Sequence, residues 1–96
     1  MERVEVEVGI PLPLRKLTDG QRSVRATGNT VSELLADLDQ QFPGLLAKLV
    51  DESGKLHRYI NIYRNGEDIR FSDSLETAVS TDDSIMIITA AAGGSV

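Results

Sequence analysis

The sequence predicts an α+β fold in which a mixed sheet of four to five strands wraps around one main helix. Three observations indicate this fold. An alternating apolar pattern begins at Val4, a capped amphipathic helix follows at about residue 31, and a tight-turn signal separates two strand-like stretches after residue 59. The chain has 96 residues, of which 41% are hydrophobic, which is enough for one domain with a single core.

The first two strands are expected to form a hairpin. Apolar residues occupy every second position of the first stretch, at Val4, Val6, Val8 and Ile10. This alternation predicts a strand with one buried face, which Pro11 and Pro13 bring to an end. The segment from Arg15 to Gln21 predicts a turn, and residues 23–26 are expected to form the partner strand.

One main helix is predicted from about Val31 to Gln41. Thr30 and Glu33 have the spacing of a capping box at its start, and a Pro-Gly pair at 43–44 stops it. Apolar residues follow at helical spacing and form one stripe, at Val31, Leu34, Leu35 and Leu38. The leucines between 45 and 49 predict a further short helical turn.

Three more strands are predicted in the C-terminal half. Residues 59–64 are strand-like, Asn65-Gly66 marks a tight turn, and 67–71 is expected to form a short strand. A turn at 81–84 precedes the last strand at 85–89. The resulting order, β-β-α-β-β-β, is that of a β-grasp or ubiquitin-like domain, which we expect to occupy residues 1–89.

The last two long strands predict which side chains face a partner. A sheet covered by helices on one side needs only one apolar face, yet residues 85–88 are all apolar. Four isoleucines are assigned to the core, namely Ile60, Ile62, Ile85 and Ile87. Tyr63, Met86 and Ile88 are then left facing outward, and we expect them to bind a partner. The alternative is that they pack beneath a loop or against a second copy of the chain.

The chain ends in Ala90-Ala91-Ala92-Gly93-Gly94-Ser95-Val96, and we expect residues 90–96 to form a flexible tail. Because glycine has no Cβ, a Gly-Gly end can enter a narrow active site. This predicts chemistry at a Gly94 carboxylate, with Gly93 and the three alanines as the lead that a partner contacts. Gly94 gains that carboxylate only after cleavage of the Gly94–Ser95 bond. The alternative is a harmless extension of a protein that carries nothing.

Composition argues against several other functions. The net charge of −5 disfavours nucleic-acid binding, which uses a basic surface. Without cysteine the chain has no disulfide, thiolate metal site or cysteine nucleophile. No segment reaches the ~20 apolar residues of a membrane span, and nothing near Met1 resembles a signal peptide, so we expect a cytoplasmic protein. His57 is the only histidine and lacks companion ligands, so no metal site and no catalytic residue are predicted.

The chain resembles the MoaD/ThiS family of sulfur carriers, the prokaryotic relatives of ubiquitin. The resemblance covers nearly the whole chain and is carried by residues 54–63, by Asn65 with 67–72, and by Ala92-Gly93-Gly94. Within that family the chain looks most like the CysO-type carriers of a thiocarboxylate-dependent cysteine pathway.

The resemblance implies a carrier protein rather than an enzyme. A partner resembling the ubiquitin-activating enzymes would adenylate the Gly94 carboxylate with ATP, and sulfide would then replace AMP to give a thiocarboxylate. That thiocarboxylate would donate sulfur to a biosynthetic enzyme. A zinc-dependent JAMM-type protease would first remove Ser95 and Val96. No cofactor is expected to stay bound, because the activating partner consumes the ATP.

Several functional alternatives stay open at this point. Cysteine synthesis is the preferred destination of the sulfur, with molybdopterin, thiamin or a secondary metabolite as alternatives. The chain is also compatible with a protein modifier that is joined to lysines through Gly94. A third interpretation is a non-catalytic β-grasp interaction domain with an inert tail.

Overall fold

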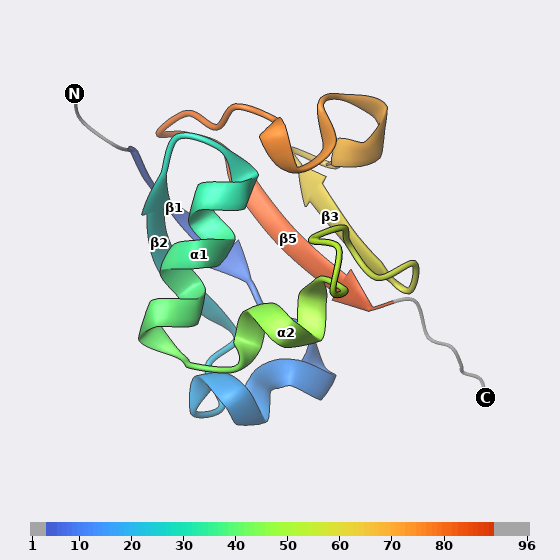
Figure 1. Cartoon of the computed structure of the whole chain (residues 1–96). Helices are drawn as coiled ribbons and strands as arrows, with labels where there is room; N and C mark the ends of the chain where they lie inside the picture. Colours follow the sequence, from blue (N-terminus) through green and yellow to red (C-terminus); the bar gives the residue numbers. More distant parts are fainter. Residues whose placement is uncertain (1–3, 90–96) are drawn as a thin grey trace.

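The computed structural model describes residues 4–89 (Figure 1). Residues 1–3 and 90–96 lie outside the described part, and with them the predicted tail. The five strands form one sheet in the order β2-β1-β5-β3-β4, and α1 and α2 cover one of its faces (Figure 1). Strand β5 is parallel to β1 and antiparallel to β3, so the sheet is mixed. The predicted α+β architecture is confirmed.

Strands β1 (Val4–Gly9) and β2 (Ser23–Gly28) form the predicted antiparallel hairpin, with Val6 opposite Ala26. Their connection differs from the prediction, because a 3₁₀ helix, η1 (Leu12–Thr18), occupies much of the segment predicted as a turn. Proline near the start of η1 fixes a helical φ. Buried Leu14 then anchors η1 to the core, and the actual turn follows at Asp19, which adopts a left-handed conformation.

Helix α1 (Val31–Gln41) has the bounds that were predicted. The Thr30 hydroxyl accepts a hydrogen bond from the Glu33 amide at 3.2 Å, and the Glu33 carboxylate accepts one from the Asn29 amide at 2.8 Å. These bonds satisfy amide groups at the start of the helix, as the capping-box spacing indicated. Helix α2 (Leu45–Leu49) is the predicted short helical turn.

Strands β3 (Ile60–Arg64) and β5 (Ser84–Thr89) lie close to their predicted positions, but β4 (Glu67–Asp68) is much shorter than the predicted 67–71. The Asp68 carboxylate accepts a hydrogen bond from the Arg70 amide at 2.8 Å. This local bond turns the chain into a 3₁₀ helix, η2 (Ile69–Phe71), in place of a continued strand. A further 3₁₀ helix, η3 (Ser74–Glu76), was not predicted.

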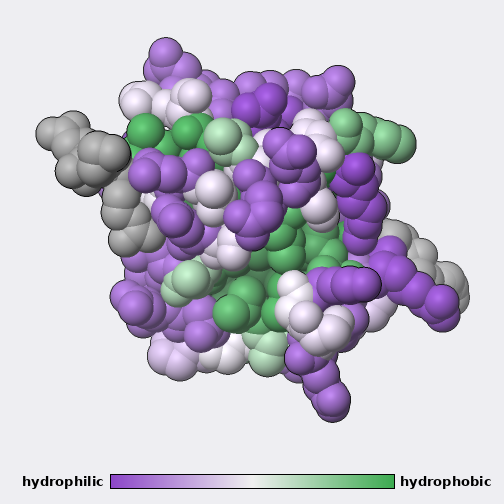
Figure 2. Space-filling model, turned by 45° about the horizontal axis from the view of Figure 1, so that its top comes forward, coloured by the Kyte–Doolittle hydropathy of each residue, from purple (hydrophilic) through white to green (hydrophobic). Residues whose placement is uncertain are grey.

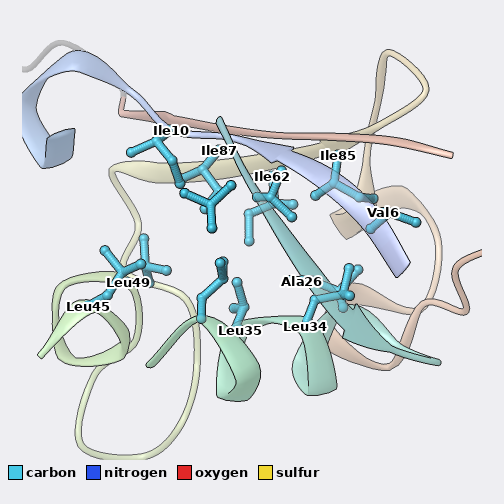
Figure 3. Close-up of a cluster of buried hydrophobic side chains, with 14 of the residues drawn as sticks. Val6, Ile10, Ala26, Leu34, Leu35, Leu45, Leu49, Ile62, Ile85 and Ile87 are labelled. Carbon is cyan, nitrogen blue, oxygen red and sulfur yellow. The ribbon is translucent and has the colours of Figure 1, made fainter. Parts of the chain in front are cut away.

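The core lies between the sheet and the two helices (Figure 3). Ile62, Ile85 and Ile87 point from the sheet toward Leu34 and Leu35 of α1, and α2 adds Leu45 and Leu49. Each of these side chains is at most 2% exposed, so the inward assignment of the isoleucines is confirmed. Burial of this apolar surface is the main favourable contribution to folding.

Gly28 lies close against the first turn of α1, and its replacement provides a test of the packing. A Cβ at Gly28 would lie 2.7 Å from the Glu33 Cβ and 2.9 Å from the Leu34 nitrogen. We expect Gly28→Ala to lower the free energy of unfolding by about 1–3 kcal/mol in urea denaturation. The matched control is Gly9→Ala, whose Cβ would make only an ordinary 3.5 Å contact with Met86. Equal stabilities of the two variants would contradict this packing.

Candidate functional site

The predicted carrier end of the chain follows directly from the central strand of the sheet. Thr89, the last residue of β5, lies opposite Ile60 of β3, so the chain leaves the sheet beside the start of β3. Gly93, Gly94 and Ser95, together with Ala90, Ala91 and Ala92, lie outside the described residues. What the structure describes is therefore the surface from which the tail begins.

Three predicted contact residues lie on the face of the sheet that the helices do not cover. Tyr63 is directly opposite Met86, and Ile88, opposite Asn61, lies two pairs further along toward the tail. Met86 is 49% exposed, Ile88 is 37% exposed and Tyr63 is partly exposed. We call Tyr63, Met86 and Ile88 the outer patch. Their outward orientation is as predicted, whereas their role in binding a partner stays a prediction.

Tyr59, directly before β3, is a further exposed aromatic residue and was not among the predicted contact residues. It is 47% exposed, and its ring stacks on His57 with the ring centres 5.1 Å apart. His57 therefore supports an exposed aromatic side chain at the start of β3. The available sequence signal was alternation, since Tyr59, Asn61 and Tyr63 would share one face of an extended strand.

Arg70 holds the start of β3 in place. Its guanidinium donates hydrogen bonds to the Ile60 carbonyl at 2.8 Å, to the His57 carbonyl at 3.2 Å and to the Asn61 side chain at 2.5 Å. The planar guanidinium thus connects η2 to the strand beside the tail. Sequence reasoning missed Arg70, because its acceptors lie 9 to 13 residues away along the chain.

A second set of polar contacts fixes where β5 begins. The Asn65 amide and side-chain oxygen bond the carbonyl and amide of Ser84, at 2.8 Å and 2.9 Å. The Asn65 side chain also donates to the Asp83 carboxylate at 2.9 Å. Because a slip of one residue would exchange the two faces of β5, these bonds determine that Met86 points outward and Ile87 inward.

Asp83 is a charged group whose surroundings alter its titration. Partial burial alone would raise the pKa of Asp83, but hydrogen bonds from the Asn65 side chain and the Ser80 amide, with the nearby Arg64, outweigh it. The pKa therefore lies below the usual 3.8. Arg64 approaches this carboxylate to 3.7 Å.

The side of the molecule that carries the helices has a hydrophobic hollow bordered by hydrophilic side chains (Figure 2). A hollow beside α2 is lined by Leu46, Ala47 and Val50 together with acidic residues, including Asp39 and Asp51. Each of these two carboxylates accepts hydrogen bonds from backbone amides near α2. Bonds from the Ser53 hydroxyl and the Lys55 amide lower the pKa of Asp51. These carboxylates therefore stabilise the loops around α2.

Two searches of the described residues bear on other kinds of function. Residues 4–89 contain no group of three or more potential metal ligands. They also contain no helix that is both long and apolar enough to cross a membrane.

Comparison with known proteins identifies the family. The sequence pattern of the ThiS family matches residues 8–94. This chain belongs to the ThiS family. The match ends at Gly94, so it includes the Gly-Gly pair and leaves Ser95 and Val96 outside.

The curated relatives include sulfur carrier proteins. The sulfur carrier protein CysO of Mycobacterium tuberculosis is 47% identical over 93 residues, covering 95% of this chain and all of the relative. A putative sulfur carrier protein of Archaeoglobus fulgidus is 32% identical, covering 93% of this chain and 98% of the relative. The prediction of a sulfur carrier of this family, as opposed to an enzyme, is confirmed by these similarities.

The solved structures agree with the fold and the family. CysO from an Amycolatopsis orientalis BexX/CysO complex superimposes with a TM-score of 0.87 at 48% identity, covering 93% of this chain and 99% of that one. Small archaeal modifier protein 1 from Methanosarcina acetivorans gives a TM-score of 0.81 at 30% identity, covering 98% of this chain and all of that one. The β-grasp prediction is therefore confirmed. The first of these structures also shows a relative assembled with a second protein.

The contacts of Asp83 predict a pH dependence of stability. A carboxylate with a lowered pKa in the folded state stabilises the fold above its unfolded pKa, and that stabilisation is lost as the pH falls through the folded value. We expect the unfolding free energy to decline below about pH 4 in the wild type and less steeply in Asp83→Asn. Urea denaturation at several pH values measures this. Asp82→Asn is the matched control, and parallel profiles for both variants would contradict the assignment.

Proposed function

We propose that this chain carries sulfur as a thiocarboxylate on Gly94, after removal of Ser95 and Val96. The observation that carries the proposal is the family match, which ends at Gly94, two residues before the end of the sequence. A carrier of this kind needs a terminal carboxylate at the glycine. Because Ser95 follows Gly94, this carboxylate requires cleavage of the Gly94–Ser95 bond.

The chemistry requires activation because a carboxylate is a poor electrophile. In the first step a Gly94 oxygen attacks the α-phosphate of ATP, forming an acyl adenylate and releasing pyrophosphate. In the second step sulfide attacks the acyl carbon; the C–S bond forms and AMP leaves. Where a persulfide delivers the sulfur, its outer sulfur displaces AMP, and a thiol of the partner then reduces the resulting acyl disulfide to release the thiocarboxylate. This chain contributes position and recognition, and the partner contributes the catalytic groups.

Three partners follow from these steps. A JAMM-type metalloprotease hydrolyses the Gly94–Ser95 bond, an adenylating enzyme resembling ubiquitin-activating enzymes consumes the ATP, and a biosynthetic enzyme accepts the sulfur. The outer patch is the surface on which we place the adenylating enzyme. The solved complex of a CysO relative with BexX supports the idea that such carriers dock on partner proteins. Cysteine synthesis is the preferred destination of the sulfur, and a reducing cytoplasm is the compartment that suits it.

A second function is supported by a specific similarity. The chain is 30% identical to small archaeal modifier protein 1 of Methanosarcina acetivorans over almost its full length. A modifier shares the activation step but transfers its acyl group to a lysine amine, with formation of an amide bond. Recovery of proteins covalently joined to Gly94 would support this alternative, whereas loss of sulfur into a small product would support the carrier.

The activation step can be tested with purified proteins. The adenylating enzyme encoded in the same genome is mixed with labelled pyrophosphate, ATP and a chain that ends at Gly94. We expect ATP–pyrophosphate exchange with this chain and none with the chain that ends at Val96, because only the first has the Gly94 carboxylate. A chain that ends at Gly93 is the control for the identity of the terminal residue. Equal exchange with the 94- and 96-residue chains would contradict the proposal.

The outer patch makes a separate prediction. We expect Met86→Asp in the trimmed chain to raise KM in the adenylation assay by about 10-fold with little change in kcat, because Met86 is separated from Gly94 by eight positions in the sequence and would act in docking rather than at the reacting carboxylate. Ala36→Asp, at an exposed position of α1, is the matched control and should leave KM within about twofold. A normal KM for Met86→Asp would exclude the outer patch as the docking surface.

A further inference from the structure

Strand β5 loses its β1 neighbour before it reaches the tail. The two strands pair only from Glu7–Ser84 to Gly9–Met86, although β5 continues to Thr89. Beyond Gly9 the chain turns away toward η1, which lies past the end of β1 (Figure 1). The last part of β5 is therefore paired with β3 on one side and open on the other.

The hydrogen-bonding pattern identifies which groups are open. The Asn65 amide bonds the Ser84 carbonyl, and pairing alternates along an antiparallel ladder, so Met86 and Ile88 direct their backbone groups toward β3. Ile87 and Thr89 consequently direct theirs toward the β1 side. In a parallel ladder the next donor for the Ile87 carbonyl would be residue 11, and Pro11 has no amide hydrogen.

A notch lies along this open edge. It has a volume of about 290 Å³, and its lining includes Pro11, Leu12, Arg15, Arg22, Ile87 and Thr89. Leu12 is 73% exposed at its rim, and Met86 and Ile88 of the outer patch also line it. The notch is thus continuous with the proposed docking surface and reaches the residue at which the tail begins.

The charge of the notch is opposite to that of the chain. Its lining contains two arginines and no carboxylate, although the chain as a whole has 15 acidic and 10 basic residues. The Arg15 Nε donates to the Ile10 carbonyl at 2.9 Å, which holds this side chain in place. Within residues 4–89 the Arg22 guanidinium has no hydrogen-bond or ion-pair partner.

We propose that the notch receives an extended, acidic segment of the adenylating enzyme, which pairs with the Ile87 carbonyl and the Thr89 amide and directs carboxylates toward Arg15 and Arg22. This inference rests on the proposed function, because the segment belongs to the adenylating enzyme that the proposed function requires. An open strand edge supplies backbone hydrogen bonds to an added strand, and the two arginines favour carboxylates over other side chains. The added strand would continue the sheet at the point from which Gly94 must reach the active site.

Two variants of the trimmed chain test the proposal in the adenylation assay. Arg22→Glu cancels the net positive charge of the notch, because one arginine then faces one glutamate, and we expect it to raise KM by about 10-fold with kcat unchanged. Lys48→Glu on α2 is the matched control, because it changes the net charge equally at an exposed residue outside the notch. Thr89→Pro removes an amide donor that faces the notch without removing a bond to β3, and should also raise KM.

Hydrogen exchange supplies a readout that does not depend on turnover. In the full chain, the Thr89 amide should exchange rapidly when free and at least about 10-fold more slowly when the adenylating enzyme is bound. The Glu52 amide, in the loop after α2, is the internal control and should exchange at the same rate in both states. An unchanged Thr89 rate in the complex would overturn the proposal.

The outcomes separate this inference from the function on which it rests. If Arg22→Glu and Lys48→Glu raise KM equally, the effect is one of net charge and the notch is excluded. If both Arg22→Glu and Thr89→Pro are adenylated with a normal KM, the notch is excluded and the carrier function stands. If the wild-type chain ending at Gly94 is never adenylated, the carrier function fails and this inference fails with it.

Discussion

The contact between the inner face of β5 and the two helices is the constraint on which the rest of the structure depends. Ile85 and Ile87 are each at most 2% exposed and pack against leucines of α1 and α2. Since side chains alternate along a strand, this burial forces Met86 and Ile88 to the other face. The same strand ends at the start of the tail, so one register determines the core, the outer patch and the direction in which the chain leaves the sheet.

Much of this arrangement could be predicted because its signals are local. The alternation of isoleucines predicted the two faces of β3 and β5, and the Thr30–Glu33 spacing located the start of α1 to the residue. The outward direction of Met86 follows from the same alternation. In each case the pattern repeats within a few residues and reflects burial, which dominates the energetics of a chain this small.

Other features depend on contacts that are distant in sequence and could not be predicted in this way. The bond that the Arg70 amide donates to the Asp68 carboxylate competes locally with strand pairing and shortens β4. Arg70 itself bonds groups in a different strand, and the notch exists only because β1 turns away beside β5. The two prolines near residue 12 predicted the end of a strand, but not that the following segment would form η1 and leave the β5 edge open.

The composition of the chain fits the proposed function. In that proposal a thiocarboxylate stores sulfur on an acyl carbon, so the carrier needs no cysteine, and the proposed partner supplies the nucleotide and the catalytic groups. The carrier must supply a rigid surface that the partner recognises. Directly after that surface it needs a C-terminal segment narrow enough to enter an active site. In this chain the outer patch and the notch lie at the point where the sheet meets the tail.

The most direct test of the central claim is the intact mass of the chain isolated from its own cells during active sulfur metabolism. A carrier should be recovered without Ser95 and Val96, partly with one oxygen exchanged for sulfur at the Gly94 carboxylate. Treatment with iodoacetamide should then add one label to the sulfur-bearing form, because the chain contains no cysteine thiol that could react. Recovery of only the 96-residue chain, with oxygen at its terminus, would contradict the account.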